Sequence, residues 1–158
     1  MARMACIGTG LIGRAWANVF ARAGWEVRLY DADPETHARS RELVALSLRD
    51  VARHGLARDP VAAAALVASA DTLEAAVADV DLVQESGPET VEAKLALFAR
   101  LDAAAPPNAI LASSSSAIVA SRFTETLTGR HRCLIAHPVN PPHVVPIVEL
   151  CGAPWTSP

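Results

Sequence analysis

The sequence has 158 residues, of which 51% are apolar, 4% aromatic and 20% charged, and its net charge is −3. The length suits one domain, the apolar content excludes an intrinsically disordered chain, and the acidic balance gives no basic field for nucleic acid. No run approaches the ~20 apolar residues of a membrane span and no secretion signal opens the chain, so we expect a cytoplasmic protein without a membrane or nucleic-acid partner.

The chain alternates short apolar runs, typical of strands buried on both faces, with stretches of helical periodicity. In order, the sequence predicts a strand at 4–7, a helix from 11 that Gly24 ends, a strand at 25–30, a helix from 34 that Gly55 ends, a helix from 60, a short strand at 67–70, a short helix at 73–78, a strand at 81–84, a helix from 88, a strand at 109–112, a short helix near 118–122, and strands at 133–136 and 144–150. Buried stripes are expected at Val44, Leu48 and Val51 and at Val91, Leu95 and Phe98. This alternation indicates an α/β fold, with a Rossmann-like, mostly parallel sheet flanked by helices.

The first motif is Gly8-Thr9-Gly10-Leu11-Ile12-Gly13, which joins the first strand to the first helix. Gly8 permits a tight turn, Gly10 leaves room for a pyrophosphate, and Gly13 lets the helix approach the sheet. Asp31 lies 18 residues beyond Gly13, where its carboxylate can accept hydrogen bonds from the adenosine ribose and repel a 2′-phosphate. Such glycines can also form a purely structural turn, but the strand, helix and acid are all in place, so the sequence predicts NAD binding.

The second motif is His137-Pro138-Val139-Asn140-Pro141-Pro142, with Glu149 in the following strand. If the two strands are neighbours, the Glu149 carboxylate can accept a hydrogen bond from one imidazole nitrogen and orient the ring. The other nitrogen can then take a proton from a substrate hydroxyl. The alternative is a histidine satisfied in a loop and a glutamate at a strand end.

Five motifs occur in an order that points to one family: Gly8-Thr9-Gly10-Leu11-Ile12-Gly13-Arg14, Leu29-Tyr30-Asp31, Gln84-Glu85-Ser86-Gly87-Pro88-Glu89, Ser113–Ser116 and His137-Pro138-Val139-Asn140-Pro141-Pro142. Together they resemble the NAD-binding domain of the 3-hydroxyacyl-CoA dehydrogenase family, and within it the lambda-crystallin / L-gulonate 3-dehydrogenase branch. The resemblance covers nearly the whole chain. It implies NAD-dependent oxidation of a 3-hydroxy group to a 3-keto group, on an acyl-CoA of fatty acid metabolism or on a sugar acid.

The resemblance also implies a catalytic set and a cofactor set of residues. The implied catalytic residues are His137 as the base, Glu149 as the carboxylate that orients it, Ser116 near substrate and nicotinamide, and Asn140 beside the nicotinamide. The implied cofactor-binding residues are Gly8, Gly10, Leu11, Ile12, Gly13, Asp31, Glu89 and Lys94. Other roles remain open: Ser116 as a helix cap, Glu89 as a favourable acid in a first helical turn, and Lys94 as an ordinary solvated side chain. Glu85, at a strand's carboxyl end, is a weaker ligand-binding candidate.

In this family a helical domain follows, closing the substrate cleft and forming a dimer. The resemblance therefore implies an NAD-binding domain over 1–152 and the start of a linker over 153–158, with the C-terminal helical domain absent. We expect these residues to bind NAD but turn over little substrate, and the full-length form to be a homodimer. A non-catalytic NAD-binding or structural module is the alternative. The three cysteines, Cys6, Cys133 and Cys151, have no metal-binding spacing and are expected to be buried free thiols.

Overall fold

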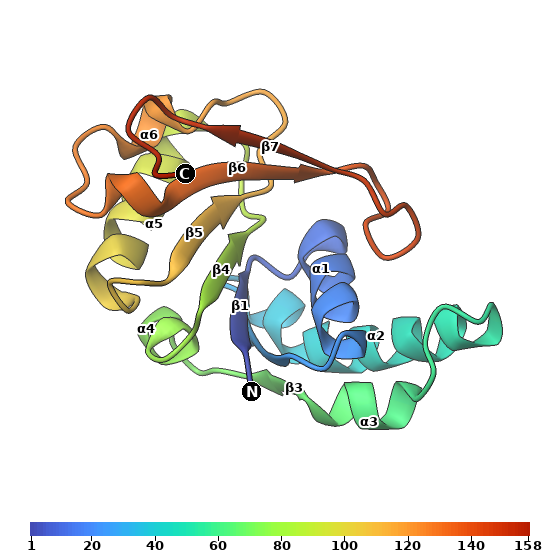
Figure 1. The fold of residues 1–158 in the computed structure, drawn as a ribbon. Coiled ribbons are helices and arrows are strands. Elements are labelled where there is room, and N and C mark those ends of the chain that lie inside the picture. The colour runs from blue at the N-terminus through green and yellow to red at the C-terminus, as the bar shows by residue number, and fades with distance from the viewer.

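A seven-stranded sheet forms the centre of the computed structural model, which describes all of residues 1–158 (Figure 1). Its strands are β1 (Arg3–Ile7), β2 (Glu26–Tyr30), β3 (Val67–Ser69), β4 (Leu82–Glu85), β5 (Ile110–Ser113), β6 (Cys133–Pro138) and β7 (Val148–Gly152). They lie in the order β3-β2-β1-β4-β5-β6-β7, and all neighbours are parallel except β6 and β7. The predicted mostly parallel α/β fold is confirmed. The order reverses between β1 and β4, where sheets of this type bind ligands at their carboxyl edge.

Helices cover both faces of this sheet (Figure 1). They are α1 (Leu11–Arg22), α2 (Pro34–Arg53), α3 (Pro60–Ala65), α4 (Leu73–Val77), α5 (Val91–Ala104) and α6 (Ser121–Thr124), with a 3-10 turn at Arg130–Arg132. Asp33 caps α2 by accepting a hydrogen bond from the Thr36 amide, and Pro34 occupies the first helical turn. The predicted helix start at 88 is wrong, because Thr90 caps α5 and the helix begins at Val91. The short helix predicted near 118–122 is α6 and lies slightly later in the chain.

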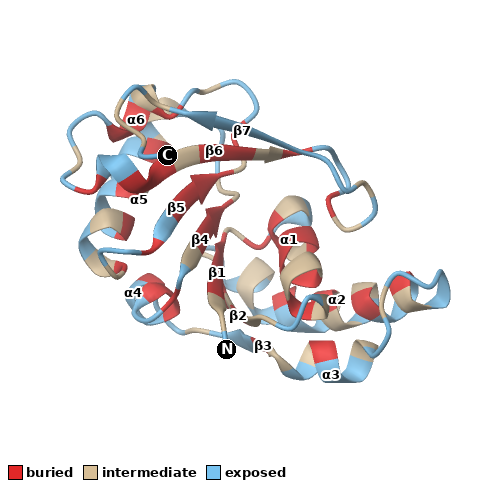
Figure 2. Cartoon of the chain, viewed as in Figure 1, coloured by how far each residue is buried: buried red, intermediate tan, exposed pale blue.

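Two apolar cores lie on opposite faces of the sheet, because successive strand residues point to opposite sides. Met4 and Cys6 of β1 pack with α1, α2 and α3, whereas Ala5 and Ile7 pack with α4, α5 and α6. The predicted stripe on α2 is confirmed, since Val44, Leu48 and Val51 are all buried. Figure 2 shows the central strands as mostly buried.

The predicted stripe on α5 is wrong in one member. Leu95 is 43% exposed, whereas Lys94, Phe98 and Leu101 turn inward. Lys94 occupies the inner position because two carboxylates meet its ammonium group there. The charged Lys94 therefore takes the buried place on α5 that the sequence pattern assigned to the apolar Leu95.

The last predicted strand also needs correction, because β7 begins at Val148 rather than at 144. The amides of Val144 and Val145 both donate to the Pro141 carbonyl, which closes a turn before the strand. All of β7 is exposed at the edge of the sheet (Figure 2). Cys151 in β7 is therefore exposed, contrary to the prediction of three buried thiols, whereas Cys6 and Cys133 are buried. No helix combines the length and apolarity that a membrane span requires.

Candidate active site and cofactor crevice

The glycine loop between β1 and α1 has one side fixed by protein atoms and one side open. Gly8 has φ of 86°, and a Cβ there would lie 2.7 Å from the Ser86 carbonyl. A Cβ on Gly13 would lie 1.8 Å from the Gly8 oxygen. A Cβ on Gly10 would meet no atom within 4 Å. Gly8 and Gly13 are therefore required by the fold, whereas Gly10 borders open space at the N-terminus of α1, which fits a bound pyrophosphate.

Asp31, directly after β2, holds this loop through hydrogen bonds to its carboxylate. Its Oδ2 accepts hydrogen bonds from the amide of Thr9 at 2.5 Å and from the Thr9 hydroxyl at 3.2 Å, and its Oδ1 accepts one from the Asp33 amide at 3.0 Å. A carboxylate has about four lone-pair sites, so acceptor capacity remains for ribose hydroxyls. The sequence did not predict these hydrogen bonds between Asp31 and Thr9, which is completely buried.

His137 and Glu149 are direct cross-strand partners in the antiparallel β6–β7 pair. The distance from His137 Nδ1 to Glu149 Oε2 is 2.8 Å, which confirms the expected imidazole–carboxylate contact. The two side chains are 31% and 73% exposed, and Nε2 makes no hydrogen bond within the protein. With Nδ1 donating to the carboxylate, Nε2 is the nitrogen that can accept a proton.

A pocket of about 280 Å³ lies beside this pair. Its lining residues are Ser115, Ser116, Ala117, Ile118, Val119, Ile135, His137, Glu149 and Cys151. Three of the four predicted catalytic residues therefore lie on one pocket, although they come from the turn after β5, from β6 and from β7. The fourth, Asn140, is exposed beyond β6 and does not line it. Cys151 was not expected in the pocket, but it is two residues from Glu149 and so shares its face of β7.

A second polar cluster connects α1 to the sheet at its carboxyl edge. Ser114 Oγ accepts hydrogen bonds from Trp16 Nε1 at 3.1 Å and Gln84 Nε2 at 2.8 Å, and lies 2.9 Å from Ser86 Oγ. Gln84 Nε2 also donates to the Ala136 carbonyl at 3.2 Å. Sequence reasoning missed this cluster because its members are far apart in the chain.

The remaining predicted cofactor residues lie in unlike surroundings. Lys94 is only 1% exposed and pairs with Glu85 and Glu89, so the alternative of a solvated lysine is wrong. Glu89 is 41% exposed, and its Oε1 accepts hydrogen bonds from the turn after β5. Leu11 is 77% exposed at the start of α1.

Residues 3–158 match the sequence model of the 3-hydroxyacyl-CoA dehydrogenase, NAD binding domain. The chain belongs to the 3-hydroxyacyl-CoA dehydrogenase family. The match confirms the resemblance derived from the motifs, and it confirms NAD as the cofactor of this domain.

Relatives of this NAD-binding domain include enzymes and a crystallin. L-carnitine dehydrogenase of Streptomyces coelicolor is 41% identical over 155 residues, which cover 98% of this chain and 48% of that protein. Lambda-crystallin of Oryctolagus cuniculus is 36% identical, with coverages of 96% and 49%. The crystal structure of 3-hydroxybutyryl-CoA dehydrogenase from Escherichia coli has a TM-score of 0.91 and 28% identity, and the match covers 99% of this chain and 33% of that one. The chain spans about half the length of the curated relatives it matches.

Proposed function

We propose that this domain is the NAD-binding half of a dehydrogenase that oxidises a 3-hydroxy group to a 3-keto group. The observation that carries the proposal is the His137–Glu149 contact of 2.8 Å beside Ser116 in one pocket. Family membership and the open side of the glycine loop at Gly10 support it.

In the proposed reaction, His137 Nε2 removes the proton from the substrate hydroxyl as C3 loses its hydride. Bound NAD would supply the hydride acceptor. Glu149 holds the ring through Nδ1 and offsets the positive charge that develops on it, so this interaction is strongest in the transition state. Ser116 holds the substrate oxygen, and Asn140 lies beside the nicotinamide.

The cofactor would lie across the carboxyl edge of β1, β2 and β4. The glycine loop and the first amides of α1, including those of Leu11 and Ile12, receive the pyrophosphate. Asp31 accepts hydrogen bonds from the adenosine ribose, and its charge favours NAD over NADP. Glu89, which is partly exposed, is the remaining side chain proposed to face the cofactor.

For substrates, we propose a small 3-hydroxy compound, either an acyl-CoA thioester or a free hydroxy acid. The relatives named L-carnitine dehydrogenase and 3-hydroxybutyryl-CoA dehydrogenase support both classes. The relative named lambda-crystallin supports the second candidate function, a non-catalytic NAD-binding module. Because the matched relatives are about twice as long as this chain, we propose that the rest of the protein completes the substrate cleft and forms a homodimer.

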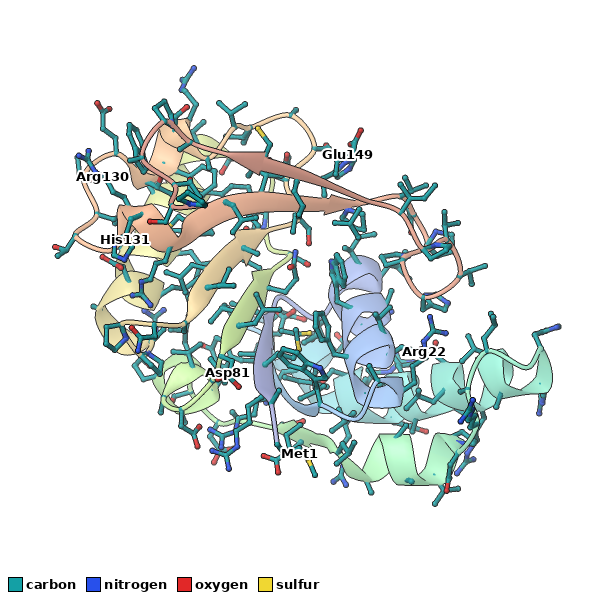
Figure 3. The ribbon with its side chains drawn as sticks, viewed as in Figure 1. Met1, Arg22, Asp81, Arg130, His131 and Glu149 are labelled. Carbon is teal, nitrogen blue, oxygen red and sulfur yellow. The ribbon has the colours of Figure 1, made fainter.

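The test is a substrate panel on the full-length protein, followed by NADH absorbance, with and without His137→Ala. Loss of a general base is expected to lower the rate by ~10²–10⁴-fold. His131→Ala is the matched control, because His131 is exposed in the 3-10 turn that precedes β6, whereas His137 lies near the other end of that strand. Figure 3 shows His131 far from Glu149, the cross-strand partner of His137. NADH formation that His137→Ala leaves unchanged would reject the catalytic role, and no turnover of any substrate would favour the non-catalytic module.

A further inference from the structure

The lysine of α5 is completely enclosed, although lysine is rarely buried without partners. Lys94 Nζ lies 2.9 Å from Glu85 Oε2, 3.2 Å from Glu85 Oε1 and 3.5 Å from Glu89 Oε2. Glu85 is itself fully buried and also accepts hydrogen bonds from Ser113 Oγ at 2.5 Å and the Gly87 amide at 2.6 Å. Every charge in the cluster therefore has partners, which is the condition under which such a cluster stabilises one geometry.

Glu89 extends this cluster to the turn at 115–117, which follows β5. Its Oε1 accepts three hydrogen bonds, from Ser115 Oγ at 2.6 Å, the Ser116 amide at 3.0 Å and the Ala117 amide at 3.2 Å. Burial alone raises the pKa of the Glu89 carboxyl. The hydrogen bonds from Ser115 and the two amides and the charge of Lys94 outweigh it, so the pKa lies below its usual range. The ionised carboxylate is thus the form that the turn stabilises.

The 115–117 turn forms one wall of the pocket that contains His137 and Glu149. An unbroken series of contacts therefore runs from Glu85 at the end of β4, through Lys94, to Glu89 and then to the backbone of Ser116. We propose that Lys94 is a positioning residue, which holds the Glu89 carboxylate and through it orients Ser116 toward His137. The expected effect of Lys94 on the reaction rate rests on the proposed function, whereas its expected effect on the 115–117 turn does not.

A positioning role and the cofactor contact expected from the family resemblance differ in what they predict. At 1% exposure, the Lys94 side chain has almost no surface with which to touch a cofactor. Positioning therefore predicts a looser 115–117 turn and a lower kcat when Lys94 is replaced, and a weaker Kd for NADH as well, because Glu89 is proposed to face the cofactor. A direct contact predicts a weaker Kd and an unchanged turn.

The test compares Lys94→Met with the double variant Glu85→Gln/Lys94→Met. Methionine keeps the length and flexibility of the side chain without the charge. The single variant leaves Glu85 buried without its counter-ion and is expected to be unstable, whereas the double variant removes the pair together and preserves folding. Asp102→Asn is the control, because the Asp102–Arg132 pair is also largely buried, at 11% and 7% exposure, but does not line the pocket.

Amide exchange in the 158-residue chain, resolved by NMR, reports the turn directly. In the double variant the Ser116 and Ala117 amides should exchange about tenfold faster, as expected when a hydrogen bond of ordinary strength is lost, while central β4 amides stay protected. In the full-length enzyme kcat should fall about tenfold or more, as for misplacement of a substrate-positioning group. Asp102→Asn should lower stability to urea and alter neither quantity.

Two results would overturn the inference: wild-type exchange at Ser116 and Ala117 in the folded double variant, or a weakened Kd for NADH with an unchanged turn. Failure of the proposed function is distinguishable from both. It would leave the wild-type protein without dehydrogenase activity, while the exchange rates would still report whether Lys94 orders the turn.

Discussion

Replacing Gly10 with alanine separates cofactor binding from folding in the glycine loop. Gly10 has φ of −63° and ψ of −164° at the N-cap of α1, a conformation that alanine adopts. Its added methyl would meet no protein atom within 4 Å. The methyl would instead enter the space in which the pyrophosphate is proposed to lie. We therefore expect a folded protein that binds NADH poorly.

The magnitudes follow from the geometry at each glycine. Alanine at an N-cap is less favourable than glycine, but it also reduces the entropy of the unfolded chain by ~0.4–1 kcal/mol. The two effects oppose each other, so Gly10→Ala should change the free energy of unfolding by less than about 1 kcal/mol. Overpacking against a bound ligand costs about 1–3 kcal/mol, which corresponds to a loss of NADH affinity of about 5- to 150-fold.

The assay titrates NADH against each variant by fluorescence and measures unfolding in urea. Gly24→Ala is the first control, because Gly24 has φ of 87° but lies at the other end of α1. It should cost about 1–2 kcal/mol of stability and leave the Kd unchanged. Gly13→Ala is the second control and should destabilise the fold, since its Cβ would lie 1.8 Å from the Gly8 oxygen. Wild-type NADH affinity in Gly10→Ala would refute the assignment of this space to the pyrophosphate.

Two further predictions concern ionisable groups. Burial raises the pKa of the Cys6 thiol and that of Cys133, the latter to about 12, whereas Cys151 is exposed. Iodoacetamide should therefore add one group to the native chain and three to the denatured chain, as measured by mass spectrometry. Two or more groups on the native chain would contradict the core packing. Because the pKa of Glu89 lies below its usual value near 4.5, the hydrogen bonds of its carboxylate are present above that value and lost as the pH falls through the lowered pKa. The NMR shift of the Ser116 amide should thus titrate with a midpoint below 4.5, and a midpoint at or above it would contradict the hydrogen-bonded geometry.

Most of the fold could be predicted because its signals are local. The cap at Asp33, the proline beside it and the glycine turn at Gly8 each act within a few residues. The α5 face was predicted incorrectly because hydrophobic periodicity cannot register that Lys94 is buried when its partner, Glu85, comes from another element. The start of β7 was misplaced because apolar residues that precede it form a turn closed on Pro141.

In the candidate site, too, the sequence predicts one part and not the other. His137 and Glu149 are 12 residues apart on strands joined by one connection, so their pairing follows from strand register alone. The contacts that hold the 115–117 turn are less accessible to sequence reasoning. Glu89 and Ser116 are 27 residues apart, and only the parallel pairing of β4 with β5 brings them together. Residues that act through a positioned backbone leave no pattern in a single sequence.

The exposure of the His137–Glu149 pair bears on how the proposed enzyme would work. The strand register supplies the geometry, but Glu149 is 73% exposed, and exposed ion pairs contribute only about 0–1 kcal/mol. In this setting the carboxylate fixes the orientation of the ring more than it stabilises a charge on it. Strong stabilisation of a protonated His137 requires that water be excluded from the pocket. Under the proposed function, the half of the protein outside these residues would supply that exclusion, and the domain described here would bind NAD while catalysing the reaction weakly.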